Sequence, residues 1–301
     1  MTIAKPGSPS EVYLWFAGAR LRTLPAAVVP VAVGTASVVA DDGTIVLWRF
    51  AVTLVLAVAI QIGVNYANDY SDGVQGLDGE ARTGPLRLVG SGLIEPSRVK
   101  RAALVAFGVA VGCGLVLAFA TSLWMLAVGV ACLWGAWNYT GGSSPYGYRG
   151  FGEVAVFVFF GLVATVGSAF VHHERFTLLA VALSVPVGLL AVALLVVNNL
   201  RDIPEDEANG KLTLAVRIGD PRTRQLFVAL FVVAALVVAV IGITQIEVAL
   251  GLIGFLAAIV PIRLVLGGAE GRDLVAALAG TGRVQIAVGA LLTVGLVLAG
   301  G

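Results

Sequence analysis

Two acidic clusters, each directly after a long apolar stretch, have the clearest capacity for chemistry in this 301-residue sequence. Their polar members are Asn65, Asn68, Asp69 and Asp72 in the first cluster, and Asn198, Arg201, Asp202 and Asp206 in the second. Asp69 and Asp72 are three residues apart, so they share one face if the helix continues, as do Asp202 and Asp206 at a spacing of four. Carboxylates at the C-terminal end of a helix oppose its dipole and repel each other. A bound divalent cation would remove both penalties.

The ligand chemistry of these clusters favours a hard metal ion. Both clusters offer carboxylate and amide oxygens, and no histidine or cysteine stands beside them. Such donors select Mg²⁺, with Mn²⁺ as an alternative. Because Mg²⁺ keeps positions for water and for phosphate oxygens of a substrate, two facing clusters would hold a diphosphate between them. The competing interpretation is that these acidic residues are only solvated.

Basic residues accompany both clusters. They are Arg20 and Arg22 before the first apolar stretch, Arg82 and Arg87 after the first cluster, Arg149 in a connecting loop, and Arg201 and Lys211 around the second cluster. A metal ion together with Arg and Lys stabilises a departing diphosphate. If that group leaves an allylic carbon, a carbocation forms and no covalent enzyme intermediate is needed. For some of these arginines a second interpretation stays open, in which membrane topology alone places them.

The composition indicates what must position these residues. Hydrophobic residues make up 58% of the chain and charged residues 12%, against about 25% charged residues in soluble domains. This argues against a soluble single domain, a disordered protein and a nucleic-acid binder. Cys113 and Cys132 lie in apolar stretches and give neither a disulfide framework nor zinc-type spacing. The sequence therefore predicts an integral membrane protein.

The uncharged stretches predict an all-α membrane bundle of about nine transmembrane helices. The expected spans are residues 23–40, 48–68, 101–120, 123–139, 154–171, 177–199, 225–243, 247–266 and 283–300. These stretches are too continuously apolar for barrel strands, and in lipid a helix satisfies its own backbone hydrogen bonds. We expect residues 1–301 to form one membrane-embedded domain, with residues 1–22 as an interfacial segment.

Lysine and arginine are distributed unequally between the two sides of such a bundle. With nine spans, 17 of the 19 lie on the side of the N-terminus, and only Arg49 and Arg175 lie on the other side. The positive-inside rule makes the first side cytoplasmic, in a plasma (inner) membrane. This side also carries the long charged connections 69–100 and 200–224, which we expect to be active-site loops.

Several motifs resemble the UbiA superfamily of intramembrane prenyltransferases, whose two Asp-rich motifs are similar to the two acidic clusters. Finer features resemble its MenA-type branch, the 1,4-dihydroxy-2-naphthoate polyprenyltransferases. These features are Arg20-Leu-Arg22-Thr-Leu-Pro25, a first motif running on to Asp78, Thr83-Gly-Pro-Leu-Arg87, a Tyr-rich stretch from Tyr139 to Tyr148, and Asn198 through Gly219. The general superfamily pattern places an aspartate where this chain has Gly76, and the longer spacing to Asp78 favours this branch.

The resemblance implies an aromatic prenyltransferase. It implies a polyprenyl diphosphate donor, a 1,4-dihydroxy-2-naphthoate acceptor, and demethylmenaquinone as the product after loss of diphosphate and CO₂. It further implies two Mg²⁺ ions on Asn68, Asp69, Asp72, Asp202 and Asp206. The candidate substrate-binding residues are Arg22, Asn65, Asn68, Arg87, Arg149, Asn198, Arg201 and Lys211. The candidate catalytic residues are Tyr139 and Tyr146, facing the acceptor or the cation, and Asp78, as a base or an outer metal ligand.

Three alternatives stay open at this point. The first is a prenyltransferase of the same superfamily that acts on another aromatic acceptor. The second is a membrane CDP-alcohol phosphotransferase, whose motif also opens Asp-x-x-Asp-Gly, but no aspartate between Asp78 and Asp202 completes that motif. The third is a secondary transporter, although transporter sites usually lie near the bilayer midplane on broken helices, whereas these acids lie at one face.

Overall fold

The computed structural model describes residues 10–77, 86–142 and 144–300, and the elements of these residues are all helical. The α-helices are α1 (Glu11–Ala19), α2 (Pro25–Ala40), α3 (Leu47–Val74), α4 (Pro96–Ala120), α5 (Met125–Asn138), α6 (Gly152–Val156), α7 (Ala164–His173), α8 (Leu178–Ala208), α9 (Leu214–Ile218), α10 (Asp220–Thr244), α11 (Gly251–Gly254), α12 (Ile259–Leu266) and α13 (Asp273–Ala299). Short 3-10 helices are η1 (Leu21–Thr23), η2 (Tyr146–Arg149), η4 (Ile246–Leu250) and η5 (Phe255–Ala258), and η3 (Phe157–Val163) is a π-helix.

The predicted multi-span helical architecture is confirmed. Within the described residues, seven helical stretches are long and apolar enough to cross a membrane. The bent pair Glu11–Thr23 and Pro25–Ala40, whose two parts meet at 50°, makes an eighth if the pair is one span. The shorter apolar helix Met125–Asn138 lies where the remaining span was predicted. The predicted number of about nine is therefore approximate.

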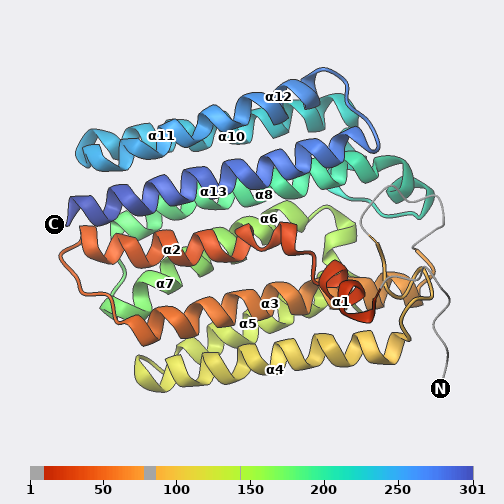
Figure 1. Ribbon diagram of the computed structural model, residues 1–301, viewed down its shortest axis with the longest axis horizontal. Coiled ribbons are helices and arrows are strands. Elements are labelled where there is room, and N and C mark those ends of the chain that lie inside the picture. Colours follow the sequence, from red (N-terminus) through yellow and green to blue (C-terminus); the bar gives the residue numbers. More distant parts are fainter. Residues whose placement is uncertain (1–9, 78–85, 143, 301) are drawn as a thin grey trace.

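The helices lie side by side along the long axis of the molecule, and α8 is the most buried of the membrane-length helices (Figure 1). It packs against α2, α10, α13 and η3. Where η3 crosses α8, a Cβ atom added to Gly161 would lie 2.7 Å from the Cα atom of Gly188. Glycine therefore allows the two backbones to approach closely, as in tightly packed membrane helices. The π-helix η3 joins α6 and α7 into one span, and such irregular turns frequently occur at functional sites.

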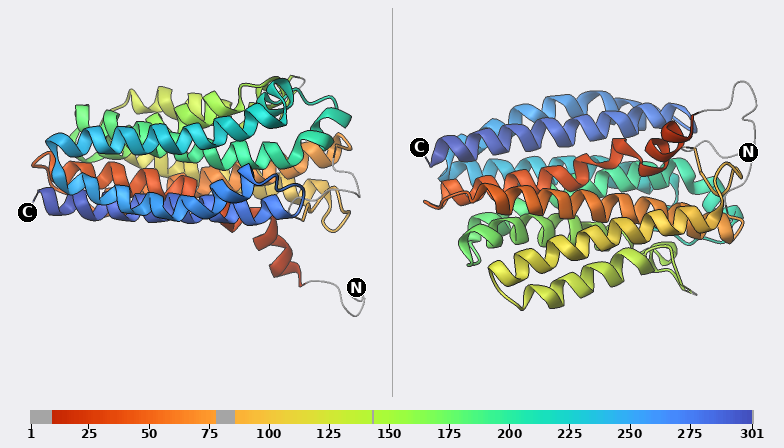
Figure 2. Two further views of the ribbon diagram at one scale, coloured as in Figure 1. Left: turned by 90° about the horizontal axis from the view of Figure 1, so that it is seen from above. Right: turned by 60° about the horizontal axis from the view of Figure 1, so that its bottom comes forward.

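The helices α3 and α8 continue past the ends of their apolar stretches. α3 runs to Val74 and α8 runs to Ala208, so the aspartates of both clusters lie on helical turns rather than in loops. Both helices finish at the same end of the bundle, which we call the acidic end, and the C-terminus lies at the opposite end (Figure 1). Helix α1 lies at the acidic end, where it projects from the bundle in one view (Figure 2) while its inner side packs against α3. The fold thus brings the two distant clusters to one place.

Candidate active site

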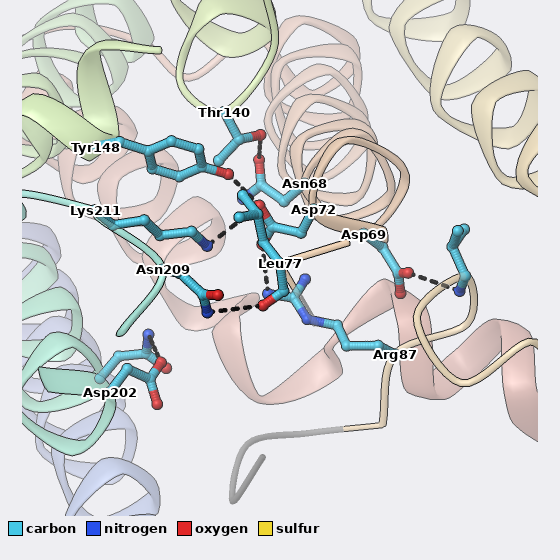
Figure 3. A network of polar contacts seen from close by, with 12 residues as sticks. Asn68, Asp69, Asp72, Leu77, Arg87, Thr140, Tyr148, Asp202, Asn209 and Lys211 are labelled. Carbon is cyan, nitrogen blue, oxygen red and sulfur yellow. Dashed lines mark hydrogen bonds and ion pairs between the residues drawn. The ribbon is translucent and has the colours of Figure 1, made fainter. Parts of the chain in front are cut away.

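Asp72 is the centre of a buried polar network at the acidic end (Figure 3). Its Oδ2 accepts a hydrogen bond from Nη2 of Arg87 at 3.0 Å, and its Oδ1 lies 3.4 Å from Nζ of Lys211. The hydroxyl of Tyr148 also donates to Oδ1, and the ring of Tyr148 lies 4.5 Å from the Lys211 ammonium. The carboxylate is therefore surrounded by two cations and a phenol that come from three separate segments.

The second carboxylate of the first cluster points in another direction. Asp69 lies one turn earlier on α3, and its two oxygens accept hydrogen bonds from the backbone N–H groups of Leu88 and Val89 at 2.9 and 3.0 Å. Figure 3 shows Asp69 directed away from Asp72 and toward this loop. The spacing of the two aspartates had predicted carboxylates that share one metal-facing side, and the structure does not bring them together.

The second cluster forms its own network on α8. Arg201 donates to both carboxylate oxygens of Asp202, from Nε at 2.7 Å and from Nη2 at 2.8 Å. Nδ2 of Asn198 donates to the same carboxylate at 3.2 Å. One turn further along α8, Asp206 accepts a hydrogen bond from Oγ1 of Thr213 at 3.4 Å. The bidentate contact of Arg201 fixes the orientation of the Asp202 carboxylate.

Lys211 connects the two clusters. Its backbone N–H donates to the carbonyl oxygen of Asp206 at 2.8 Å, while its ammonium reaches Asp72. A second link lies beside it, because Nδ2 of Asn209 donates to the carbonyl oxygen of Leu77 at 3.1 Å. The ends of α3 and α8 are therefore tied directly to each other, as two facing clusters require.

Both clusters line one cavity of about 850 Å³. Its polar wall at the acidic end includes Asn68, Asp72, Arg87, Asn198, Asp202, Asp206 and Lys211. The remaining wall is predominantly apolar and comes from α2, α3, α4, α5, η3, α7 and α8. Beyond Gly167 on α7, it reaches the aromatic rings of Trp124, Phe170 and Phe176 toward the opposite end. A ligand with a charged head and a long apolar tail matches this division.

The oxygen donors on the polar wall fit a hard cation. They come from Asn68, Asp72, Asn198, Asp202 and Asp206. In the part of the chain that the structure describes, no three His, Cys, Asp or Glu side chains gather closely enough to hold an ion by themselves. Mg²⁺ commonly takes only one or two carboxylates and completes its shell with water and substrate phosphates. The residues therefore fit Mg²⁺ held jointly with a diphosphate, rather than Mg²⁺ in a protein cage.

A family model described as "UbiA prenyltransferase family" matches residues 27–277, which include both clusters and most of the residues that line the cavity between them. The chain belongs to this family. The predicted family, fold and enzyme class are thereby confirmed, and the all-helical bundle is that of a membrane-embedded prenyltransferase.

Similar proteins come from several organisms. The chain is 46% identical over 286 residues to the "1,4-dihydroxy-2-naphthoate octaprenyltransferase" of Mycobacterium leprae, a match that covers 95% of this chain and 97% of the relative. The Escherichia coli protein of the same name is 35% identical over 229 residues, with 72% of each chain covered.

Two solved structures share the fold. The apo structure of a UbiA homolog from Aeropyrum pernix K1 has a TM-score of 0.67 at 14% identity, covering 88% of this chain and 96% of that one. A UbiA homolog from Archaeoglobus fulgidus, described as bound to GPP and Mg²⁺, has a TM-score of 0.64 at 12% identity, covering 93% and 99%.

In this UbiA family member, the Tyr-rich loop lines the cavity beside the clusters. The ring of Tyr146 stacks on Trp134 at 6.3 Å and meets Tyr139 edge-on at 5.6 Å. Its hydroxyl donates to the carbonyl oxygen of Gly135 on α5 at 2.7 Å. Burial raises the pKa of Tyr146 to about 12. Tyr146 is therefore a neutral phenol at any ordinary assay pH and is not ready to act as a base.

This charge state gives a testable pH dependence. A raised pKa keeps Tyr146 protonated until the pH approaches about 12, so its ionisation shapes no limb of a pH–rate profile between about pH 6 and 9. Tyr146→Phe should lower prenyl transfer by about two- to fivefold, because one hydrogen bond is lost, and should leave both limbs at their wild-type pH. A profile measured for both proteins decides the matter, since a displaced basic limb would mean that the phenol titrates during turnover.

The other predicted site residues differ in whether they line the cavity. Asn65 lines the cavity, and its Nδ2 donates to the carbonyl oxygen of Ala19 at 2.9 Å, which ties α3 to the α1–η1 junction. Arg22 and Arg149 are exposed and are not among the described residues of the cavity wall. Asp78 lies outside the described residues.

The structure also reveals polar residues that motif reasoning had not assigned to the site. Tyr148 contacts Asp72, and Oγ1 of Thr140 donates to Oδ1 of Asn68. Glu153 is buried at the start of α6, where its Oε1 accepts a hydrogen bond from Asn199 at 3.0 Å. Asn199, beside the predicted Asn198, lines the cavity. Thr140, Tyr148 and Asn199 lie inside the motif stretches 139–148 and 198–219, which was the sequence signal for them, whereas Glu153 lies outside both stretches.

Proposed function

We propose that this protein transfers a polyprenyl group from polyprenyl diphosphate to 1,4-dihydroxy-2-naphthoate. Diphosphate and CO₂ leave, and the product is demethylmenaquinone in its quinol form. The observation that carries this proposal is the division of the cavity into two parts. Its polar end holds Asp72, Asp202 and Asp206 together with basic side chains, and the long remainder is apolar. The names of the relatives from Mycobacterium leprae and Escherichia coli support the choice of acceptor.

Two Mg²⁺ ions are the proposed cofactor. Asn68, Asp72, Asn198, Asp202 and Asp206 would hold them together with the diphosphate, because these residues supply the oxygen atoms on the polar wall. When bound, the ions would neutralise the negative charge that develops on the departing diphosphate. Support comes from the Archaeoglobus fulgidus homolog of the same fold, which is described as bound to GPP and Mg²⁺.

The cations at the polar end have a second task in this proposal. Arg87 and Lys211 pair with Asp72, and Arg201 pairs with Asp202. When the donor enters, these cations would turn from carboxylate to phosphate oxygens, and the carboxylates would become available to the metal ions. The basic side chains therefore stabilise the leaving group, and their ion pairs keep both partners buried and satisfied beforehand.

The acceptor would lie against the Tyr-rich loop. Tyr139 and Tyr146 line the cavity next to the acidic end, where neutral aromatic faces can contact a naphthoate ring and the allylic cation. The ring carbon of the acceptor forms a bond to the allylic carbon of the donor as the bond from that carbon to the diphosphate oxygen breaks. The apolar walls exclude water, which would otherwise capture the cation. Asp78 remains the proposed base for a phenolic proton.

The orientation in the membrane is inferred from the distribution of basic residues between the acidic end and the opposite end of the bundle. We propose that residues 1–301 form one domain in the plasma membrane with the acidic end facing the cytoplasm. The distribution of cations supports this, because Arg49 and Arg175 contact residues of the opposite end, through Glu174 and the carbonyl oxygen of Asp41.

Mass spectrometry of lipid products tests the proposal. The purified protein is offered one prenyl diphosphate, Mg²⁺ and several aromatic acids in separate reactions. We expect a prenylated naphthoquinol that has lost one CO₂ only with 1,4-dihydroxy-2-naphthoate. A product formed only with another acid would assign a different acceptor. No product with any acid and no release of diphosphate would contradict the proposed reaction.

A further inference from the structure

The loop that carries Arg87 is attached to α3 by a carboxylate. Asp69 is fully buried, and its Oδ2 and Oδ1 accept hydrogen bonds from the backbone N–H groups of Leu88 and Val89 at 2.9 and 3.0 Å. An ionised carboxylate that binds two backbone N–H groups makes strong, charge-assisted hydrogen bonds. Both oxygens of this aspartate are therefore directed at the loop.

Side-chain packing holds the same loop in place. Leu88 is fully buried, and it contacts α1 so closely that a Cβ atom at Gly18 would lie 2.6 Å from its Cδ1. On α3, a Cβ atom at Gly73 would lie 2.4 Å from Cγ1 of Val89. Glycines on two helices thus make room for two consecutive loop side chains. Side-chain packing therefore fixes the position of this loop, which is uncommon for a connection that is free to move.

This attachment also determines where the preceding residue, Arg87, lies. Arg87 directly precedes Leu88, and its guanidinium reaches the cavity and donates to Asp72 at 3.0 Å. Asp69 therefore receives the backbone of the loop, while Asp72, one turn further along α3, receives the side chain of Arg87. The two aspartates hold consecutive parts of one segment.

We propose that Asp69 is a positioning residue that fixes Arg87 at the polar end of the cavity, and that it is not a metal ligand. This inference rests on the proposed function, in which Arg87 contacts the diphosphate. Without the carboxylate, the N–H groups of Leu88 and Val89 lose their acceptor, the loop loosens, and Arg87 no longer stands ready when the donor enters. The role thus differs from that implied by the aspartate motif.

Kinetics of Asp69→Asn and Asp72→Asn distinguish the two roles. Asp69→Asn should raise KM for the prenyl diphosphate by about tenfold, because the charge is lost and the new amide nitrogen cannot accept one of the two hydrogen bonds, while kcat changes by less than about threefold. The Mg²⁺ concentration for half-maximal activity should stay at the wild-type value in Asp69→Asn and should rise in Asp72→Asn. Adding Arg87→Ala to Asp69→Asn should cause little further loss, since both changes act through the position of the Arg87 guanidinium.

A measurement without metal or substrate tests the attachment itself. In the metal-free protein, hydrogen–deuterium exchange of the segment 86–94 should be faster in Asp69→Asn than in the wild type and unchanged in Asp72→Asn. If the Asn variant does not fold, Val89→Pro removes one of the two N–H donors and should reproduce the KM effect with an unchanged Mg²⁺ requirement. The inference is overturned if Asp69→Asn raises the Mg²⁺ requirement as Asp72→Asn does while exchange of 86–94 stays unchanged. An inactive wild type with the expected exchange would instead contradict only the proposed function.

Discussion

Asp72→Asn should lower the rate of prenyl transfer by about a thousandfold. Asp72 is the carboxylate of the first cluster that faces the cavity, and three partners surround it, namely Arg87, Lys211 and Tyr148. Asparagine keeps the size of the side chain but removes the charge that binds a cation and pairs with these two basic groups. Both the proposed metal and the arrangement of the basic groups are therefore lost together. Initial rates of product formation in detergent, with donor and Mg²⁺ at saturating concentrations, measure the effect.

A matched control separates this effect from a general loss of negative charge. Asp273 lies at the start of α13, is exposed, and is not among the described residues of the cavity wall. Asp273→Asn should therefore keep wild-type activity. Thorough chelation of divalent cations should abolish transfer by the wild type, and added Mg²⁺ should restore it. Activity of Asp72→Asn within about tenfold of the wild type, or activity that survives chelation, would remove the metal-bound diphosphate from the mechanism.

Hydropathy predicted the spans well because burial in lipid imposes a single demand on every residue of a span. It could not predict where helices α3 and α8 end. Both continue through polar residues to Val74 and Ala208, because side-chain contacts at the acidic end replace the lipid as the stabilising environment. Hydropathy therefore ended both spans too early, at residues 68 and 199, although the helical continuation was what the spacing of the aspartates had required.

The limits of motif reasoning are clearest at Asp69 and Asp72. Three residues along an α-helix correspond to a rotation that leaves two side chains about 60° apart. This angle is small enough to predict a shared face, yet large enough for two different neighbours. The backbone that follows Arg87 lies on the side of α3 to which Asp69 points, whereas Asp72 points elsewhere. The placement of this loop depends on packing against Gly18 and Gly73. Such tertiary contacts are not encoded in a local spacing.

The basic residues illustrate a second limit. Arg87, Arg201 and Lys211 line or adjoin the polar wall, whereas Arg22 and Arg149 are exposed beyond it. All five lie on the side that the positive-inside rule assigns to the cytoplasm, so topology alone explains each of them equally well. The structure separates them by burial, since a buried cation must have an anionic partner and an exposed one need not.

Gly167→Leu should make the enzyme discriminate against long prenyl donors. Gly167 lines the far, apolar part of the cavity on α7, and a Cβ atom added there meets no atom within 4 Å. The leucine side chain would therefore occupy space that we assign to the donor tail. For octaprenyl diphosphate, kcat/KM should fall by about ten- to a hundredfold, the effect of about 1–3 kcal/mol of overpacking. For geranyl diphosphate, whose tail ends closer to the acidic end, kcat/KM should change by less than about threefold.

The same substitution on the outer surface provides the comparison. Gly108 on α4 is also open to an added Cβ atom, but it is exposed and is not among the described cavity-lining residues. Gly108→Leu should leave the ratio of kcat/KM for the two donors unchanged. Equal losses for both donors in Gly167→Leu would mean that the leucine disturbs the bundle rather than the tail. An unchanged ratio in Gly167→Leu would show that the tail leaves the cavity before α7, so the apolar wall there would need another explanation.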